Sequence, residues 1–288
     1  MIDSPSSMKA NLLALGAIAQ WASLAALGVA LAHVPPFLLT GLGLLVGSLI
    51  ALPLSRFDWR QWRVPLKTLA VGVYGLFGFH FLLFIALRHA PPVPVNLVNY
   101  LWPLGIVVMA PLFLPGVSLT GRHVFAALVG FAGAALAILG GRTTDPNAPI
   151  WAWGYIPALM SAFIWASYSL LTQRVKAFPT AAVGSFALVS ALLALLCHAW
   201  LEASTALSAK DCTLITLLGL SPLGGSFFIW DAALKQGDAR QIGVLSFLTP
   251  LLSTLVLLVM QREAPGWPVG LAAAMIVGAA VLATRSKA

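Results

Sequence analysis

Two segments of the chain place a polar residue four positions before a proline, a spacing that can expose hydrogen-bonding groups inside a helix. Asn99 precedes Pro103, and Ser246 precedes Pro250. A proline within a helix removes the hydrogen bond to the carbonyl four residues back and kinks the helix. We therefore expect each segment to form a hinge that presents a free carbonyl and a polar side chain to a ligand. A kink that serves only helix packing is the alternative interpretation.

Four of the ten tryptophans are candidates for holding an apolar or aromatic ligand, because they lie away from the expected ends of the apolar segments. Their sequence neighbours are small or polar, and two of these neighbours, Tyr100 and Tyr168, are further candidates. A tryptophan offers a large apolar face and one N–H donor. A single deep tryptophan usually serves packing, but four of them favour a ligand cavity. The four are Trp21, Trp102, Trp165 and Trp230.

Ionisable residues within the apolar segments are few. His80 shares its segment with Tyr74 and several glycines, so we expect it to be a ligand contact or proton site, or else a satisfied buried histidine. Asp231 precedes Lys235 by four residues, which is the spacing of an ion pair on one helix face. No carboxylate lies in the middle of an apolar segment, which indicates weak or absent coupling to protons or sodium ions.

Motifs for metal binding, cofactor binding and catalysis are missing from the sequence. The two cysteines, Cys197 and Cys212, form no ligand cluster and are interpreted as ordinary buried thiols. The chain has no glycine-rich phosphate loop, no His/Cys ligand spacing and no nucleophile motif. We therefore expect no cofactor, no metal ion and no enzymatic activity.

The composition indicates that these residues lie in a membrane. Sixty per cent of the 288 residues are hydrophobic and only 8% are charged, and the mean hydropathy is +0.96. This composition predicts an all-α membrane protein, because a spanning helix needs roughly 20 apolar residues and tolerates few charges. The formal net charge of +8 is then explained by membrane topology and attraction to anionic lipid, rather than by nucleic-acid binding.

Charged residues and prolines divide the chain into ten expected transmembrane helices. Residues 9–56 hold two of them, separated by Pro35-Pro36. The others lie near 67–88, 88–122, 122–142, 150–173, 179–201, 212–234, 241–261 and 267–284. Ten crossings place both termini on one side of the membrane. Twelve Lys and Arg residues fall on that side and four on the other, so the positive-inside rule predicts cytoplasmic termini.

The first half of the chain recurs in the second half. At offsets of 144 to 147 residues, the aligned blocks are Trp21-Ala22-Ser23 with Trp165-Ala166-Ser167, Pro35 with Pro179, Ala86-Leu87-Arg88 with Ala233-Leu234-Lys235, and Leu101 to Leu104 with Leu248 to Leu251. Blocks that recur in the same order indicate an internal duplication. Within them Trp102 aligns with Thr249, and Asn99 with Ser246, so the halves share their hinges and differ in their ligand groups.

Each copy contains five expected crossings. Because this number is odd, the second copy, residues 149–288, enters the membrane in the opposite sense to the first copy, residues 1–148. The prediction is therefore two inverted five-helix repeats around a central cavity. Exchange of conformations between inverted repeats turns a cavity open to one side into a cavity open to the other, which is alternating access.

This layout resembles the drug/metabolite transporter superfamily, and within it the EamA-type permeases. The resemblance covers nearly the whole chain and rests on Ala-Leu followed by Leu-x-Pro in each half. Glu263, Gly270 and Gly278 also fit the family's pattern after the ninth crossing. The first half departs from it, because Val117-Ser118 stands near the expected position of the acidic residue.

A narrower resemblance rests on two short motifs. Asn99-Tyr100-Leu101-Trp102-Pro103 and Phe163-Ile164-Trp165-Ala166 look like segments of the bacterial inner-membrane exporters of aromatic amino acids. This resemblance implies export of aromatic and other neutral amino acids from the cytoplasm through a central cavity. It also implies an inner-membrane location and peripheral positions for the fifth and tenth crossings.

The candidate residues favour a small, partly apolar solute such as a zwitterionic amino acid. A broader exporter of drugs or metabolites, including cationic dyes such as viologens, is the alternative within transport, and a membrane enzyme or a scaffold is the alternative outside it. The expected partners are the amino-acid substrate and the lipid bilayer, without nucleic acid, and the oligomeric state, a monomer included, is left open. The expected substrate-binding residues are Trp21, His80, Asn99, Tyr100, Trp102, Trp165, Tyr168, Trp230 and Ser246, with Pro103 and Pro250 as hinges.

Overall fold

The computed structural model describes residues 5–140 and 152–284, and within these two ranges the chain is helical, without a β-strand. The helices of the first half are α1 (Pro5–Ala22), α2 (Leu24–Ala30), α3 (Pro36–Ser48), α4 (Ala51–Leu54), α5 (Leu66–Val73), α6 (Phe79–His89), α7 (Pro92–Asn99), α8 (Trp102–Phe113) and α9 (Gly121–Leu139). Those of the second half are α10 (Tyr155–Leu171), α11 (Val183–Leu201), α12 (Ala209–Leu220), α13 (Gly225–Gln236), α14 (Ala239–Leu245), α15 (Leu248–Gln261) and α16 (Trp267–Thr284). Shorter turns are η1 (Trp59–Trp62), η2 (Tyr74–Gly78) and η3 (Thr180–Ala182). The all-helical class predicted from the sequence is confirmed.

Eight helical runs of the described residues are long and apolar enough to cross a membrane. They are Met8–Ala30, Pro36–Leu54, Leu66–His89, Pro92–Phe113, Gly121–Leu139, Thr180–Leu201, Ala209–Gln236 and Ala239–Gln261. Two shorter apolar helices, α10 and α16, lie where the sequence predicts two further crossings. Large apolar side chains such as Leu112, Phe125 and Val259 are more than half exposed, as expected of surfaces that face lipid rather than water.

Several of these runs are interrupted near their middle. The first run breaks between α1 and α2 at Ser23, whose hydroxyl donates to the Gln20 carbonyl at 2.7 Å. α7 ends at Asn99 and α8 begins at Trp102, and α14 and α15 are separated by Ser246 and Phe247. The interruptions predicted at the two proline segments are therefore present.

One detail of the second interruption differs from the prediction. The backbone carbonyl of Ser246 is not free, because it accepts the N–H of Thr249 at 3.0 Å. The chain tightens at this break into a turn that joins residues three apart. The N–H just before Pro250 thereby reaches the carbonyl that the proline cannot bond.

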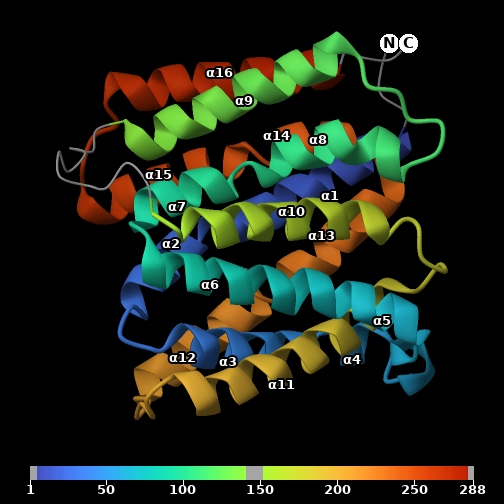
Figure 1. Ribbon diagram of the computed structural model, residues 1–288, viewed down its shortest axis with the longest axis vertical. Helices are drawn as coiled ribbons and strands as arrows, with labels where there is room; N and C mark the ends of the chain where they lie inside the picture. Colours follow the sequence, from blue (N-terminus) through green and yellow to red (C-terminus); the bar gives the residue numbers. More distant parts are fainter. Residues whose placement is uncertain (1–4, 141–151, 285–288) are drawn as a thin grey trace.

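Helices from the two halves of the chain pack against one another in pairs (Figure 1). α9 lies along α16, α3 along α11, and α1 along α13. α10 packs against α6 and α8 in the same way that α1 packs against α13 and α15, so this pattern of contacts is unchanged when the halves are exchanged. α9 and α16 lie at one edge of the bundle, where they form a separate hydrophobic core with residues of α8, α14 and α15.

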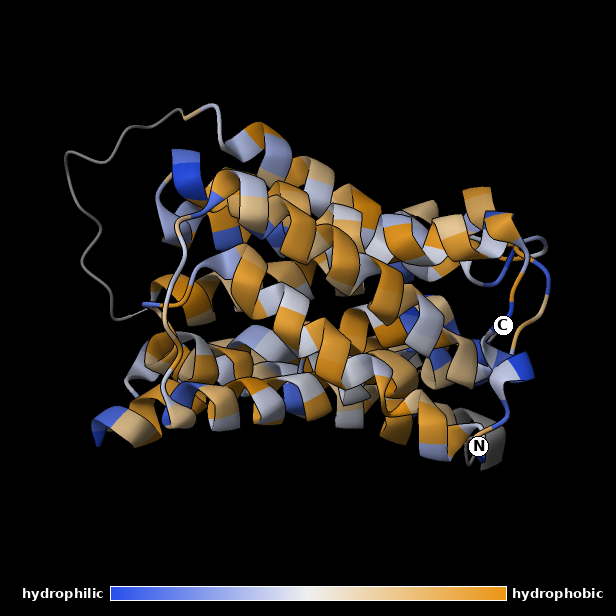
Figure 2. Ribbon diagram, turned by 90° about the horizontal axis from the view of Figure 1, so that it is seen from below, coloured by the Kyte–Doolittle hydropathy of each residue, from blue (hydrophilic) through white to orange (hydrophobic). Residues whose placement is uncertain are grey.

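The two ends of the bundle can be told apart. α1 begins and α16 ends at the same end, on the right in Figure 1, which we call the terminal end. α2, the start of α3 and the end of α6 lie at the opposite end, which we call the mouth end. Hydrophobic residues cover the length of the helices, and hydrophilic residues gather mainly toward both ends (Figure 2). This distribution suits a bundle whose middle lies in the apolar part of a bilayer.

Candidate functional site

A cavity of about 490 Å³ lies between the helices of the two halves. Its walls include Gly28 of α2, Thr40 near the start of α3, Leu87 near the end of α6, and Leu257 near the end of α15. All four positions lie toward the mouth end, so the cavity extends from the middle of the bundle toward that end. Its volume is in the range of sites for small molecules.

The four deep tryptophans form a single cluster at the inner limit of this cavity. Trp21 comes from α1, Trp102 from α8, Trp165 from α10 and Trp230 from α13, two from each half of the chain. All six pairs of ring centroids lie 5.1–6.5 Å apart, within the usual range of aromatic pairs. No ring is more than 8% exposed. Trp21, Trp102 and Trp165 line the cavity and form its floor, and Trp230 packs behind them.

A π-helical turn determines how His80 meets the cavity. η2 precedes His80, and the carbonyl of Leu76 in this turn lies 2.6 Å from His80 Nδ1. A carbonyl oxygen only accepts hydrogen bonds, so Nδ1 carries a proton, and in the neutral imidazole Nε2 is left as an acceptor. His80 lines the cavity, and among the described residues Nε2 has no hydrogen-bond partner. The turn therefore presents the Nε2 edge of the imidazole on the cavity wall, in agreement with the frequent presence of π-turns at functional sites.

Polar side chains meet the cavity where the two proline segments break. Asn99 lines it, and its Oδ1 accepts the Ser161 hydroxyl at 3.0 Å. Asn96 and Tyr100 line the same wall from α7 and the break that follows it. Thr249 lines the cavity from the second proline segment, and its buried Oγ1 has no partner among the described residues. The cavity thus combines aromatic faces with amide and hydroxyl groups, and its lining contains no Asp, Glu, Lys or Arg of the described chain.

Most of the residues singled out from the sequence lie together at this cavity. The lining includes Trp21, His80, Asn99, Tyr100, Trp102, Trp165 and Pro250. The others lie behind it. Tyr168 packs against Trp165 with ring centroids 5.4 Å apart, and Trp230 donates through Nε1 to the Ser169 hydroxyl at 3.2 Å.

Ser246 and Pro103 are also set back from the cavity. The Ser246 side chain is fully buried and donates to the carbonyl of Ile242 at 2.8 Å. Pro103 is buried in the first turn of α8. Their place is in the helix breaks themselves rather than on the wall.

Sequence reasoning missed many residues of the lining, among them two phenylalanines, an asparagine and a threonine next to the residues that it found. Phe79 and Phe227 flank Trp165 with centroid distances of 5.2 and 5.6 Å, and nothing in their spacing distinguishes them from the other phenylalanines. Asn96 and Thr249 did carry a signal. Asn96 lies one helical turn before Asn99, on the same face, and Thr249 occupies the repeat position of Trp102.

Polar contacts close the terminal end behind the tryptophan cluster. Lys235 Nζ lies 2.6 Å from Asp231 Oδ2, so the ion pair predicted from their spacing is confirmed. The same oxygen accepts the Thr180 hydroxyl at 2.7 Å, and Nζ also donates to the Phe178 carbonyl at 2.9 Å. These bonds tie the last turns of α13 to the chain at the start of α11. In the part of the chain that the structure describes, no group of three or more His, Cys, Asp or Glu residues is placed to hold a metal ion.

Known proteins are similar to this chain in both sequence and fold. The model of the EamA-like transporter family matches residues 8–139 and again residues 152–285. A protein of Ancylobacter novellus named aromatic amino acid exporter YddG is 40% identical over 97% of this chain and 98% of its own length. A probable amino-acid metabolite efflux pump of Salmonella typhimurium is 30% identical over 89% of this chain and 88% of its own length.

A solved crystal structure superposes on the chain with a TM-score of 0.89. Its sequence is 38% identical, and the match covers 97% of each chain. The relatives, the solved structure and the two matches of the family model cover both halves of the chain and agree on one family. The chain therefore belongs to the EamA-like transporter family and is a multi-pass membrane transporter rather than an enzyme.

Proposed function

We propose that this transporter exports aromatic and other neutral amino acids across the inner membrane. The observation that carries the proposal is the cavity itself, which joins a floor of tryptophans to amide, hydroxyl and imidazole groups without a fixed charge. An aromatic side chain would pack on the indole faces. The ammonium group would donate to acceptors such as His80 Nε2, and the carboxylate would accept from Asn or Trp N–H groups. The relatives named as aromatic amino acid exporters support this substrate class.

The proposed binding residues fall into two groups. Trp21, His80, Asn99, Tyr100, Trp102 and Trp165 contact the substrate, while Tyr168, Trp230 and Ser246 hold the walls from behind. Pro103 and Pro250 act as hinges, because each lies just after a break in its transmembrane run.

The proposed mechanism is alternating access between two inverted five-helix repeats, residues 1–148 and 149–288, which together span the membrane ten times. The contacts between the halves, which remain the same when the halves are exchanged, support this mechanism. The Lys and Arg distribution supports cytoplasmic termini. With that orientation, the cavity of this structure faces away from the cytoplasm and the tryptophan floor closes the cytoplasmic side.

Counterflow of radiolabelled phenylalanine in proteoliposomes tests the binding site. We expect Trp102→Ala and Asn99→Ala each to lower flux about tenfold, as the loss of about 1.4 kcal/mol of binding free energy would. Trp200→Ala is the matched control, because Trp200 is 77% exposed and lies outside the cavity. Unchanged flux in both cavity variants, with folded protein, would remove the proposed site. Repeating the assay with and without a pH gradient measures coupling to protons.

A broader exporter of drugs and metabolites is the second candidate. The relative named as a probable amino-acid metabolite efflux pump favours it. The uncharged lining argues against a cationic dye as the preferred solute, since it offers no carboxylate to pair with a fixed positive charge. Competition of a viologen against phenylalanine in the counterflow assay separates the two candidates.

A further inference from the structure

Arg88 and Lys235 occupy equivalent positions in the two halves, near the ends of α6 and α13. Arg88 lies at the mouth end and Lys235 at the terminal end. Each cation lies over an aromatic ring beside the start of another helix. The guanidinium carbon of Arg88 is 5.4 Å from the centre of the Phe37 ring, and Lys235 Nζ is 3.8 Å from that of Phe178. The two cations differ in the carboxylate that each one meets.

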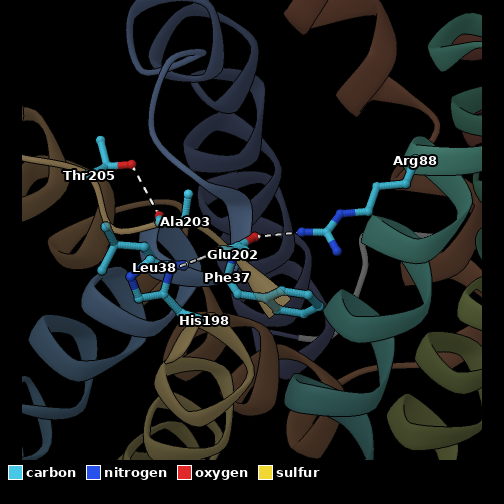
Figure 3. A network of polar contacts seen from close by, with 7 residues as sticks. All are labelled: Phe37, Leu38, Arg88, His198, Glu202, Ala203 and Thr205. Carbon is cyan, nitrogen blue, oxygen red and sulfur yellow. Dashed lines mark hydrogen bonds and ion pairs between the residues drawn. The ribbon is translucent and has the colours of Figure 1, made fainter. Parts of the chain in front are cut away.

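At the mouth end, Arg88 is paired with a carboxylate from the other half of the chain. Figure 3 shows Arg88 reaching from α6 to Glu202, which directly follows α11, at 3.0 Å. The Glu202 side chain is only 3% exposed, and it also contacts His198 Nδ1 at 2.9 Å. Its two oxygens accept the backbone N–H groups of Phe37 and Leu38 at 3.0 and 3.2 Å. One carboxylate thus joins the second half to α3 and α6 of the first half.

The counterpart of Glu202 in the first half is Asp58. The two residues are 144 positions apart, which is the offset that aligns Pro35 with Pro179 at the start of the same transmembrane run. Asp58 directly precedes η1, is exposed, and accepts the backbone N–H of Arg60 at 3.0 Å. An acidic residue is therefore present at the same repeat position at the terminal end, and it has no cationic partner among the described ion pairs.

Asp58 and Lys235 lie next to the same short segment. η1, which Asp58 precedes, packs against η3. Lys235 donates to the carbonyl of Phe178, just before η3, and its partner Asp231 accepts the hydroxyl of Thr180 within η3. In this structure Lys235 pairs with Asp231. A movement of η1 over η3 would bring the Asp58 carboxylate toward Lys235.

Inverted repeats change the open side by exchanging the conformations of their halves. A contact between the halves in one state therefore has its repeat counterpart in the other state. Arg88–Glu202 belongs to the state whose cavity extends to the mouth end, and its counterpart is Lys235–Asp58. We propose that Asp58 is a positioning residue of the transport cycle, which pairs with Lys235 when the cavity opens to the terminal end, while Arg88 and Glu202 separate. The inference rests on the alternating access of the proposed function.

The exposure of the two cations suits such an exchange. The side chains of Arg88 and Lys235 are 35% and 29% exposed, so each ion pair is partly screened by solvent and stabilises its state modestly. Formation of one pair as the other breaks keeps the two states close in free energy. Removal of either pair shifts the balance toward the state that does not use it.

Thiol labelling at two depths measures this balance without a substrate. In a background with Cys197→Ala and Cys212→Ser, Ser253→Cys reports opening to the mouth end, and in a second protein Thr172→Cys reports opening to the terminal end. Ser253 lines the cavity and is half-buried, whereas Thr172 is 8% exposed and follows α10 at the terminal end. The ratio of mouth-side to terminal-side labelling rates, for protein in lipid nanodiscs with a charged thiol reagent, follows the ratio of the two states.

We expect Asp58→Asn to raise this ratio and Arg88→Gln to lower it, each about two- to fivefold, the range of a partly exposed ion pair. Asp58→Glu should restore the wild-type ratio. Glu263→Gln, which neutralises another exposed carboxylate, should leave it unchanged. The Asp58 side chain is exposed and accepts only a backbone N–H among the described contacts, so its variants are expected to fold.

Opposite shifts would not arise from a purely structural role. If Asp58→Asn leaves the ratio at the level of Glu263→Gln, or shifts it in the same direction as Arg88→Gln, the exchange of ion pairs is overturned. Amino-acid counterflow by the wild-type protein with an unshifted ratio would keep the proposed function and reject this inference. Opposite shifts in a protein that shows no amino-acid counterflow would keep this inference and reject the proposed function.

Discussion

At the scale of single residues, the site is defined by what its polar groups bond in the protein. Asn99 Oδ1 and His80 Nδ1 have protein partners that orient them. Thr249 is different, because its Oγ1 is buried on the cavity wall without a partner among the described residues. A buried hydroxyl without a partner costs free energy, so its presence there indicates a bond to something that enters the cavity.

Replacement of Thr249 by valine separates a structural from a functional role. We expect Thr249→Val to keep or raise the melting temperature, because the unsatisfied hydroxyl is removed at nearly constant shape. Affinity for the substrate should fall about fivefold, as loss of a hydrogen bond worth about 1 kcal/mol predicts. Thr216→Val serves as the control, since Thr216 is exposed on α12 and bonds the Cys212 carbonyl. Unchanged affinity in counterflow titrations would show that the hydroxyl contributes nothing to substrate binding.

At the scale of elements, close approach of helices depends on small residues at defined positions. Gly75 in η2 faces the ring of Tyr168, and a Cβ added there would lie 2.2 Å from Tyr168 Cγ. Tyr168 in turn packs against Trp165 of the floor. The π-turn therefore has two consequences, because it places His80 on the wall and leaves room for the ring that supports the tryptophan cluster.

Gly75→Ala tests this packing. The added methyl group must displace the Tyr168 ring, so we expect a loss of about 1–3 kcal/mol of stability, typical of overpacking. Thermal melting in detergent measures it. Gly278→Ala is the matched control, because nothing lies within 4 Å of a Cβ at that position of α16. Equal melting temperatures for the two variants would contradict the close packing of η2 on α10.

At the scale of the whole molecule, the halves are joined by polar contacts at both ends. Glu202 joins them at the mouth end. At the terminal end, Arg240 at the start of α14 donates to the Ser118 carbonyl between α8 and α9, and it pairs with Asp238. Burial of Asp238 opposes its ionisation, but hydrogen bonds to Arg240 and the charge of Arg240 outweigh this and lower the pKa of Asp238. Ionised Asp238 therefore holds Arg240 in place for its contact with the first half.

The sign of the pH dependence follows from this lowered pKa. A carboxylate with a lowered pKa stabilises the folded state above its ordinary range, and this contribution is lost as the pH falls through the lowered value. We expect Asp238→Asn to melt below wild type at neutral pH, by at most about 1 kcal/mol because 39% of the Asp238 side chain is exposed. The difference should shrink as the pH falls through the lowered pKa of Asp238 and be absent below it, where the carboxyl is protonated. A difference that is independent of pH would assign the effect to something other than this charge.

The amino-acid sequence by itself determined the class of the molecule and much of its plan. Apolar runs long enough to cross a bilayer predict a membrane protein. The shared spacing around Pro103 and Pro250 located two helix breaks that the structure contains, because a proline removes the same hydrogen bond wherever it occurs in a helix. The four deep tryptophans were identified from their positions, because depth within an apolar run can be counted along the chain.

Only the tertiary structure decided what those residues face. Trp21, Trp102, Trp165 and Trp230 come from four helices, and their meeting within 6.5 Å depends on how the helices are rotated and paired. The Ser246 hydroxyl and carbonyl bond within their own segment, whereas its repeat counterpart Asn99 lines the cavity. Equivalent positions in a sequence share their backbone, but the partners that a polar group finds depend on neighbours brought from elsewhere in the chain. For that physical reason the helix breaks could be predicted from residue spacing, whereas the residues of the cavity wall could be identified only from the packed helices.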